Sequence, residues 1–424
     1  MKSAKESAVQ KERNQGVERG EGIRLLKQEI REKIRGRMDY GRDYEDEEIE
    51  EMIDEALLGR EELTFYPVET RLRLKKELFD SMRRLDILQL FVEDGSVTEI
   101  MINGKDHVFV ERDGKLERLE ISFESEELLK DVIQRIAAGC NRSVNEASPI
   151  MDGRLESGAR VNVVLDPVAL NGPIVTIRRF PENPITMERL LGSGTITREA
   201  ADFLRRLVAA RYNIFISGGT GSGKTTFLNV LSSYIPNDER IITIEDSAEL
   251  QLMGIDNLVR LETRNRTADG CREIGVRELI RTSLRMRPSR IILGEVRGAE
   301  ALDMLQCMNT GHDGSMSTGH ANSAGDMLSR LENMVLMGAD LPLQAIRQQI
   351  ASSIDVIVHL GRLRDKSRRV LEISEVAGLK NGEIRLLPLF MFEESGMDGG
   401  RVQGRLLLKG ELKNERKLRA AGLL

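Results

Sequence analysis

The chain has 424 residues, 40% of them hydrophobic and 31% charged, which is ordinary for a protein of two or three folded domains. Aromatic residues make up only 4% and Trp is absent, so the chain lacks the aromatic faces on which single-stranded nucleic acid stacks. The net charge of −6 also disfavours a nucleic-acid binder, and no specific nucleic acid is expected as a partner.

Three cysteines without a CxxC pair argue against a disulfide framework or a zinc site, and they suit a reducing compartment. The N-terminus lacks the apolar segment of a signal peptide, and no run approaches 18 apolar residues. These features predict a cytoplasmic protein whose contact with a membrane is peripheral or made through a partner.

Residues 1–60 are rich in charge and predict a lead-in that is disordered or partly helical. Apolar residues then recur at helical spacing in two groups: Ile49, Met52, Ile53, Ala56 and Leu57, followed by Leu74, Leu78, Met82 and Leu85. Two interpretations fit these amphipathic helices. They either dock a partner or pack on their own domain, and the second is favoured.

Residues 61–180 predict an α+β domain built on an antiparallel sheet. The turn dipeptides Asn103-Gly104 and Asp113-Gly114 are strong hairpin signals because both central residues of such a turn take positive φ. They separate three expected strands, Val97–Ile102, His107–Glu111 and Leu116–Ile121. A helix follows, with one apolar face formed by Leu128, Leu129, Val132, Ile133 and Ile136.

Residues 181–197 are rich in Pro, Gly and Thr and predict a hinge between domains. In residues 198–392, short apolar runs at Asn213–Ser217, Ile241–Ile244 and Ile291–Leu293 alternate with helical stretches. This alternation is typical of an α/β domain with a parallel sheet covered by helices on both faces. Residues 393–424 are Gly-rich and then basic, and they predict a C-terminal tail.

The strongest motif is Gly218-Gly219-Thr220-Gly221-Ser222-Gly223-Lys224-Thr225, which fits G-x-x-x-x-G-K-[ST] between an apolar strand and a helix. Glycines allow backbone N–H groups to wrap phosphate oxygens, and the N-terminus of the helix adds its positive dipole. Lys224 is then expected to bridge the β- and γ-phosphates, and Thr225 to hold Mg²⁺. Residues 218–226, ending at Thr226, are the predicted ATP-binding segment.

Two further apolar runs end in carboxylates. Ile291-Ile292-Leu293-Gly294-Glu295 resembles a Walker B element, in which a carboxylate at the carboxyl end of a strand reaches Mg²⁺ or a water molecule. The segment 242–249 places Glu245 at another strand end, where a general base suits an attacking water. The alternative interpretation is a solvated corner with acidic caps.

Residues 310–322 hold two of the four histidines, His312 and His320, among glycines and small hydroxyl residues. The spacing of these histidines matches no metal pattern, so the segment predicts a polar loop that senses the γ-phosphate. Arginines form the last group of candidates, because arginine stabilises charge on a transferred phosphoryl group. They are Arg154, Arg160, Arg178 and Arg179 in the first domain, with Arg285, Arg287 and Arg297 near Glu295. Surface arginine is common, so this group alone is a weak signal.

Together these segments resemble the secretion ATPase superfamily, with the tight-adherence (Tad, CpaF-type) pilus-assembly branch as the nearest resemblance. The resemblance rests on a Walker A element at 218–225, an acidic box at 242–249, a Walker B element at 291–295 and a His box at 311–322, in the family order. The runs 96–104, 172–180, 284–298 and 301–317 are also close to that branch. The chain lacks the tetracysteine zinc module of some type II secretion ATPases.

The resemblance implies a RecA-like P-loop ATPase domain preceded by an α+β domain, and a homohexamer with ATP and Mg²⁺ at subunit interfaces. It implies that Glu295 serves the metal and the water, that Glu245 is the base and that His320 is the main residue of the His box. Arg160, Arg178 and Arg179 correspond to arginines that reach the nucleotide from the first domain. Polytopic inner-membrane platform proteins are the implied partners.

Three alternatives stay open at this point. The first is a conjugative or type IV secretion ATPase that moves DNA or effector proteins, since the four boxes do not separate it from a pilus motor. The second is a small-molecule kinase, which needs a second-substrate pocket and a lid. The third is a nucleotide-regulated scaffold without turnover, against which the intact Lys224, Glu245 and Glu295 argue.

Overall fold

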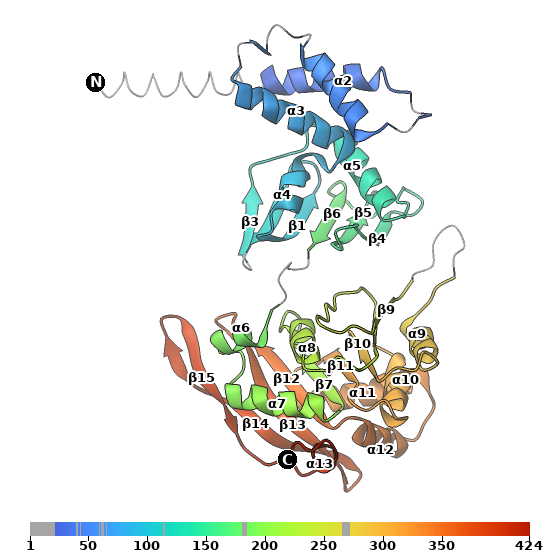
Figure 1. Cartoon of the computed structure of the whole chain (residues 1–424), viewed down its shortest axis with the longest axis vertical. Coiled ribbons are helices and arrows are strands. Elements are labelled where there is room, and N and C mark those ends of the chain that lie inside the picture. The colour runs from blue at the N-terminus through green and yellow to red at the C-terminus, as the bar shows by residue number, and fades with distance from the viewer. Residues whose placement is uncertain are drawn as a thin grey trace. The chain divides into compact units, whose positions relative to one another are not determined.

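The computed structural model describes residues 22–39, 41–42, 44–58, 60, 63–64, 66–112, 115–179, 185–264 and 272–424. The chain divides into two compact units, Met1–Glu182 and Asn183–Leu424 (Figure 1). Within the described ranges, no helix combines the length and the apolar character that crossing a membrane requires.

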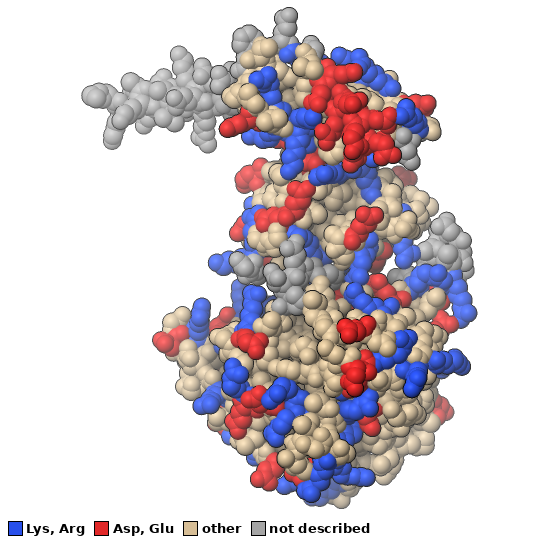
Figure 2. Space-filling model, in the orientation of Figure 1, with Lys and Arg blue, Asp and Glu red and all other residues tan. Residues whose placement is uncertain are grey.

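The first unit begins with a small helical cluster. Residues 22–35 form a helix, which packs with α2 (Asp46–Leu58) and α3 (Val68–Arg83) around a shared apolar core. The two amphipathic helices are therefore confirmed, and their apolar faces are buried inside their own unit. Figure 2 shows Asp and Glu side chains gathered over these N-terminal helices, where α2 carries an acidic outer face. Residues 1–21 of the predicted lead-in lie outside the described residues.

A six-stranded antiparallel sheet forms the rest of this unit, in the order β3-β2-β1-β6-β5-β4. Its strands are β1 (Val97–Asn103), β2 (Val108–Arg112), β3 (Lys115–Leu119), β4 (Ile150–Arg154), β5 (Arg160–Val164) and β6 (Ile174–Arg178). The short helices η2 (Asp86–Leu88) and α4 (Gln89–Glu93) lead into it. The predicted amphipathic helix is α5 (Glu126–Gly139), whose apolar residues pack in one core with alternate residues of β1, β5 and β6.

The Asn103-Gly104 turn differs from its prediction. Residues 104–107 connect β1 to β2, and the only positive φ at the dipeptide is that of Gly104, at 67°. The Gly104 N–H donates to the Pro173 carbonyl at 2.9 Å, and a Cβ at Gly104 would lie 2.6 Å from the Asn171 carbonyl oxygen. Glycine is thus required by close approach of a second loop rather than by a two-residue turn. The other dipeptide, Asp113-Gly114, lies outside the described residues.

The second unit is built on a nine-stranded sheet in the order β15-β14-β13-β12-β7-β11-β10-β8-β9. Six neighbouring strands are parallel: β7 (Ile214–Gly218), β8 (Ile241–Glu245), β9 (Leu258–Glu262), β10 (Arg290–Leu293), β11 (Met316–His320) and β12 (Val356–Arg362). An antiparallel extension follows, formed by β13 (Arg368–Lys380), β14 (Glu383–Asp398) and β15 (Arg401–Leu408).

Helices cover both faces of this sheet (Figure 1). One apolar core contains α6 (Met187–Gly192), α7 (Arg198–Ala209), α8 (Lys224–Ser232) and α13 (Arg416–Ala420). The other contains α9 (Val276–Ser283), α10 (Glu300–Asn309), α11 (Ala324–Gly338) and α12 (Leu343–Ser353). Along β7, Ile214 and Ile216 belong to the first core and Phe215 to the second, because successive side chains of a strand point to opposite faces. Burial on both faces explains why the parallel strands read as unbroken apolar runs.

Two predicted boundaries do not match the structure. The predicted hinge 181–197 contains α6, whose Met187 and Leu190 are buried in the core of the second unit. The predicted tail 393–424 contains the end of β14, all of β15 and α13. Leu406 and Leu418 of this segment are buried in the same core. Sparse but well-placed apolar residues bury against the sheet, which local composition does not reveal.

A stability measurement checks whether the C-terminal segment is part of the second unit's fold. Leu418 is only 5% exposed, so Leu418→Ala is expected to lower the free energy of unfolding by about 2–4 kcal/mol, the usual effect of truncating a buried leucine. Leu408 is 53% exposed and is the matched control, with an expected change within about 0.5 kcal/mol. Urea unfolding followed by circular dichroism gives both values. Equal small effects would show that α13 does not contribute to the core.

Candidate functional site

The glycine-rich motif that is predicted to bind phosphate connects β7 to α8 as a loop, called the phosphate loop from here on. Gly221 and Gly223 have φ of 69° and 94°, which residues with a Cβ rarely adopt. At Gly218, a Cβ would lie 2.4 Å from the Leu360 carbonyl oxygen of β12. The helix α8 begins at Lys224, so Thr225 and Thr226 occupy its first turn, where backbone N–H groups have no partner within the helix.

Lys224 is buried at the start of α8. Its Nζ donates to the Gly219 carbonyl at 3.0 Å and lies 3.3 Å from Nδ1 of His320. Burial lowers the pKa of Lys224, and the carboxylate of Glu295 opposes this shift. The ammonium is therefore held beside the loop by a backbone carbonyl, a contact that it can exchange for phosphate oxygens. Ser222 stabilises the same loop by donating to the Gly219 carbonyl at 2.9 Å.

Glu245 ends β8 and is 4% exposed. Its Oε1 accepts the backbone N–H groups of Glu249 and Leu250, both at 2.8 Å. Burial raises the pKa of Glu245 to about 7, although these two hydrogen bonds oppose the shift. A carboxyl group with a pKa near the working pH is suited to accept a proton from water.

Glu295 follows β10 and contacts two cationic or polar side chains. Its Oε1 lies 2.9 Å from Nε2 of His320, within ion-pair distance, although Oε1 accepts no hydrogen bond from the described residues. Its Oε2 accepts a hydrogen bond from Arg297 at 2.8 Å. Burial and the nearby Lys224 lower the pKa of His320, so its imidazole is neutral at pH 7. Lys224, Glu295 and His320 thus form one contiguous group at the carboxyl ends of β7, β10 and β11.

The predicted polar loop at 310–322 is confirmed for residues 310–315 and 321–322 but not for the residues between them. Residues Met316–His320 form β11, a buried strand paired in parallel with β10 and β7. Ser317 and Thr318 are buried there, and Thr318 donates to the Gly294 carbonyl at 2.7 Å. Strand pairing on both sides satisfies the backbone, and small hydroxyl side chains can then be accommodated in a central strand. Register places His320 opposite Gly218, which explains its contact with Lys224.

Two buried carboxylate oxygens have the chemistry for a cation or ordered water, although no three or more His, Cys, Asp or Glu side chains of the described residues are grouped to hold a metal ion. Among the described residues, Oε2 of Glu245 and Oε1 of Glu295 are buried and have no hydrogen-bond partner. Buried carboxylate oxygens without partners are unfavourable by themselves and are satisfied by a cation or by ordered water. Together with the Thr225 hydroxyl in the first turn of α8, these residues have the chemistry that Mg²⁺ prefers.

A pocket of about 310 Å³ adjoins the phosphate loop on the side of β12. It is lined by Ser222, Gly223 and Thr226 of the loop and first turn, and by the connection between β12 and β13. Ile185, Leu190 and Phe227 give it apolar walls, while Ser193 and Thr195 contribute hydroxyl groups. A volume and lining of this kind suit the base and ribose of a nucleotide.

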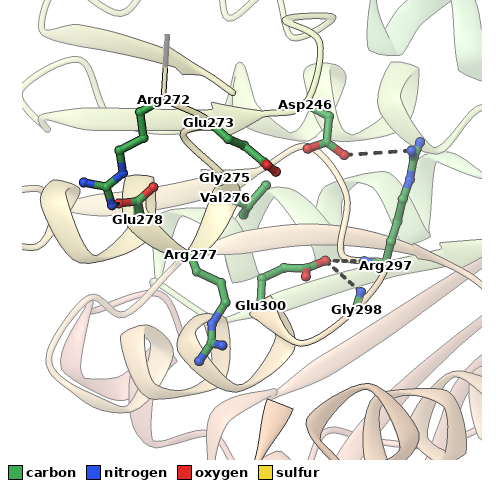
Figure 3. Close-up of a pocket in the computed structure, with 10 residues that line it drawn as sticks. All are labelled: Asp246, Arg272, Glu273, Gly275, Val276, Arg277, Glu278, Arg297, Gly298 and Glu300. Atoms are coloured by element: carbon green, nitrogen blue, oxygen red, sulfur yellow. Dashed lines mark hydrogen bonds and ion pairs between the residues drawn. The ribbon is translucent and has the colours of Figure 1, made fainter. Parts of the chain in front are cut away.

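A second, wider cavity of about 870 Å³ lies on the carboxylate side, next to Asp246 and Arg297 (Figure 3). Arg297 lies 3.8 Å from Asp246, and its backbone N–H donates to Glu300 at 2.6 Å. Charged side chains dominate its lining, including Arg272, Arg277 and Glu278. This cavity is open and ionic, so it suits the binding of a nucleoside less well than the smaller pocket.

The predicted arginines of the first domain lie in the first unit. Arg160 and Arg178 are directly opposite each other on β5 and β6, with Glu99 on the other side of Arg178. Arg160 lies 3.7 Å from Asp152 of β4, and the Glu99 carboxylate is beside Arg178, so both cations have acidic neighbours within the first unit. The Arg179 side chain instead donates to the Asp94 carbonyl at the start of the sheet. Their role toward nucleotide stays a prediction for all three residues.

Sequence reasoning missed two contributors. Gly294 is required because a Cβ there would lie 2.9 Å from Cγ of Glu245, and only the register of β10 on β8 reveals this. His359 of β12 is buried beneath the loop, with Nδ1 at 2.7 Å from the Ser217 hydroxyl. The residues lie 142 positions apart, so no local pattern indicates their contact.

This arrangement is that of a RecA-like α/β domain, and the comparisons with known proteins agree. The solved structure of the ATPase DotB from Legionella pneumophila shares the fold, at 21% identity and a TM-score of 0.50, over 69% of this chain and 80% of that chain. The family model described as "Type II/IV secretion system protein" matches residues 83–419. The chain belongs to this family.

Two curated relatives illustrate the family. The conjugal transfer protein TrbB of Rhizobium radiobacter is 34% identical over 325 residues, covering 76% of this chain and 96% of the relative. The type IV secretion system protein PtlH of Bordetella pertussis is 33% identical over 315 residues, covering 68% of this chain and 93% of the relative.

Proposed function

We propose that the protein is an ATP hydrolase that powers a type II/IV secretion machine or the assembly of a Tad-type pilus. The observation that carries this proposal is the convergence of Lys224, Glu245, Glu295 and His320 at adjacent strand ends beside the phosphate loop. These residues come from four strands or helices, and together they supply a phosphate ligand, a base and metal-binding oxygens.

The residues have separate roles in this proposal. Residues 218–226 bind the phosphates of ATP, and Lys224 neutralises charge on the β- and γ-phosphates. Glu245 accepts the proton of the attacking water, for which its pKa of about 7 is suited. His320 and Arg297 orient the Glu295 carboxylate from its two sides. Thr225 and Glu295 would hold Mg²⁺, which when bound withdraws negative charge from the phosphates.

The proposal that this protein is a motor also requires that the subunits assemble into an oligomer. One of Arg160, Arg178 and Arg179 supplies positive charge to the transferred phosphoryl group within a homohexamer. ATP binding favours a closed conformation, and loss of the γ-phosphate contacts after hydrolysis releases it. Such a cycle moves a docked partner, for which a polytopic inner-membrane platform protein at the cytoplasmic face is the proposed kind.

A conjugative or type IV secretion ATPase that moves DNA or effector proteins is the second candidate. The names of the relatives favour it, since TrbB is a conjugal transfer protein and PtlH a type IV secretion system protein. Both candidates use the same ATP chemistry and differ in cargo. A pilin and two polytopic platform proteins encoded beside this chain would favour the pilus machine.

The proposal is tested by steady-state ATP hydrolysis of the purified chain beside Glu295→Gln. We expect the variant to lose about 100-fold or more in kcat, because the amide holds neither Mg²⁺ nor His320 as the carboxylate does. Oligomer mass with and without ATP is measured on the same samples, with a ring of six subunits expected for both proteins. A wild-type chain that stays inactive and monomeric with a membrane partner present would contradict the motor and favour the scaffold.

A further inference from the structure

One arginine outside every recognised motif reaches the phosphate loop. Arg368 is the first residue of β13, and its Nε donates to the Gly221 carbonyl at 2.9 Å across 147 positions of sequence. We propose that Arg368 is a nucleotide-binding residue whose guanidinium contacts the α-phosphate of the bound nucleotide. This inference rests on the proposed function, because it assigns a contact within the same ATP site.

The order of strands defines the direction in which a nucleotide lies. The catalytic candidates follow β8, β10 and β11, all on one side of β7, whereas β12 and β13 lie on the other side. A triphosphate on the loop has its γ-phosphate toward Glu245 and Glu295, so its nucleoside end points toward β12 and β13. The 310 Å³ pocket on that side is lined by Arg368, Thr226 and Leu360. Arg368 therefore stands where the α-phosphate meets the nucleoside.

The charge of Arg368 is not neutralised within the described part of the chain. There, no Asp or Glu pairs with it, and its two Nη atoms have no hydrogen-bond partner. By comparison, Arg364 is paired with Glu394 and Arg297 with Glu295. Arg189 and Lys366 are further cations that line the same pocket as Arg368. A guanidinium with only Nε engaged keeps its Nη donors for phosphate oxygens. Its charge-assisted hydrogen bonds to phosphate are stronger than those of a neutral donor.

The neighbouring contacts hold Arg368 in place. A Cβ at Gly223 would lie 3.4 Å from Cδ of Arg368, so the side chain runs along the loop in van der Waals contact. The next residue, Arg369, donates to the Ser193 carbonyl, and the Val370 N–H donates to the Thr195 carbonyl at 2.8 Å. The start of β13 is thus attached to the segment after α6 and to the phosphate loop. This attachment lowers the entropic cost of placing the guanidinium on a ligand.

The test compares the binding of two probes, ADP and pyrophosphate, each with Mg²⁺, by calorimetry. Arg368→Ala is expected to weaken ADP binding about 10- to 100-fold, the range for losing charge-assisted hydrogen bonds to a phosphate. Pyrophosphate has two phosphate groups that can occupy the α- and β-positions of ADP, so Arg368→Ala is expected to weaken its binding as well. Arg368→Lys keeps the positive charge but lacks the two coplanar Nη donors. Its affinity for ADP is expected to lie between those of wild type and Arg368→Ala. Arg385 of β14 is exposed and lines neither pocket, so Arg385→Ala is the control for loss of one cation.

Kinetics separate this role from that of an arginine at the γ-phosphate. Arg368→Ala is expected to raise KM for ATP by the same factor and to change kcat by no more than about twofold, because the contact lies away from the reacting bond. Equal ADP affinity in Arg368→Ala and wild type would overturn the assignment. Unchanged pyrophosphate affinity beside weakened ADP binding would overturn it too, since Arg368 would then contact the nucleoside and not a phosphate. If wild type itself binds no nucleotide, the proposed function fails and this inference fails with it.

Discussion

Lys224→Ala is expected to abolish ATP turnover, with a loss in kcat of about 1,000-fold or more. Lys224 is the only described residue whose ammonium lies both against a loop carbonyl and beside His320. Removing a preorganised cation from the site where phosphate charge develops lowers kcat roughly 100- to 1,000-fold by itself. Weaker binding of ATP in the ground state lowers turnover further. Steady-state phosphate release and ADP calorimetry measure the two contributions.

The fold is expected to survive this change. Burial lowers the pKa of Lys224, so the folded state disfavours the charged ammonium and its removal does not lower the thermal midpoint. Lys380→Ala removes an exposed lysine at the end of β13 and is the matched control, with turnover unchanged. Residual turnover above about a tenth of wild type in Lys224→Ala would show that the loop is not the phosphate site.

Glu245→Gln is expected to lower kcat/KM by about 100- to 10,000-fold at pH 8, the usual range for losing a general base. In wild type, the pKa of Glu245 is raised to about 7, so kcat/KM is expected to rise about tenfold per pH unit below pH 7 and to level off above it. The variant should lose this dependence, because its amide does not titrate. A pH–rate profile from pH 5.5 to 8.5 measures both effects.

The contribution of Glu245 to the free energy of unfolding is expected to fall as the pH rises, whereas kcat/KM rises. The pKa of Glu245 in the folded chain lies above its ordinary value of 4.5, so the folded state binds the proton more tightly than the unfolded state. The contribution of this group is therefore complete below about pH 4.5 and is lost as the pH rises toward 7. Glu245→Gln should remove that slope from the pH dependence of unfolding.

A matched control isolates the role of Glu245. Glu262 pairs with Glu245 in register on the edge strand β9 and is exposed, so Glu262→Gln should keep both turnover and the pH profile. A wild-type profile that is flat between pH 6 and 8 would rule out Glu245 as the base and leave it a structural cap for the segment at Glu249 and Leu250.

Local patterns in the sequence determined the phosphate loop, the buried parallel strands and the carboxylates at their ends. The phosphate loop is specified by its own glycines, since a residue with a Cβ rarely adopts the positive φ of Gly221 and Gly223. The strands β7, β8 and β10 were predicted because burial on both faces requires continuous apolar runs. Carboxylates at the ends of such strands then meet at one edge, which is why Glu245 and Glu295 could be proposed without a structure.

The tertiary structure decided whatever depends on partners distant in sequence. Residues 316–320 of the His box form the interior strand β11 because β7 and β10 pair with it on both sides, a requirement that its polar composition conceals. Residues 393–424 belong to the second unit because Leu406 and Leu418 are buried in its core against residues far along the chain. Arg368 reaches Gly221 only after β12 and β13 are placed beside β7. Hydrophobic pattern and backbone freedom are local properties, whereas strand order and the contacts between loops form only when the whole sheet is assembled.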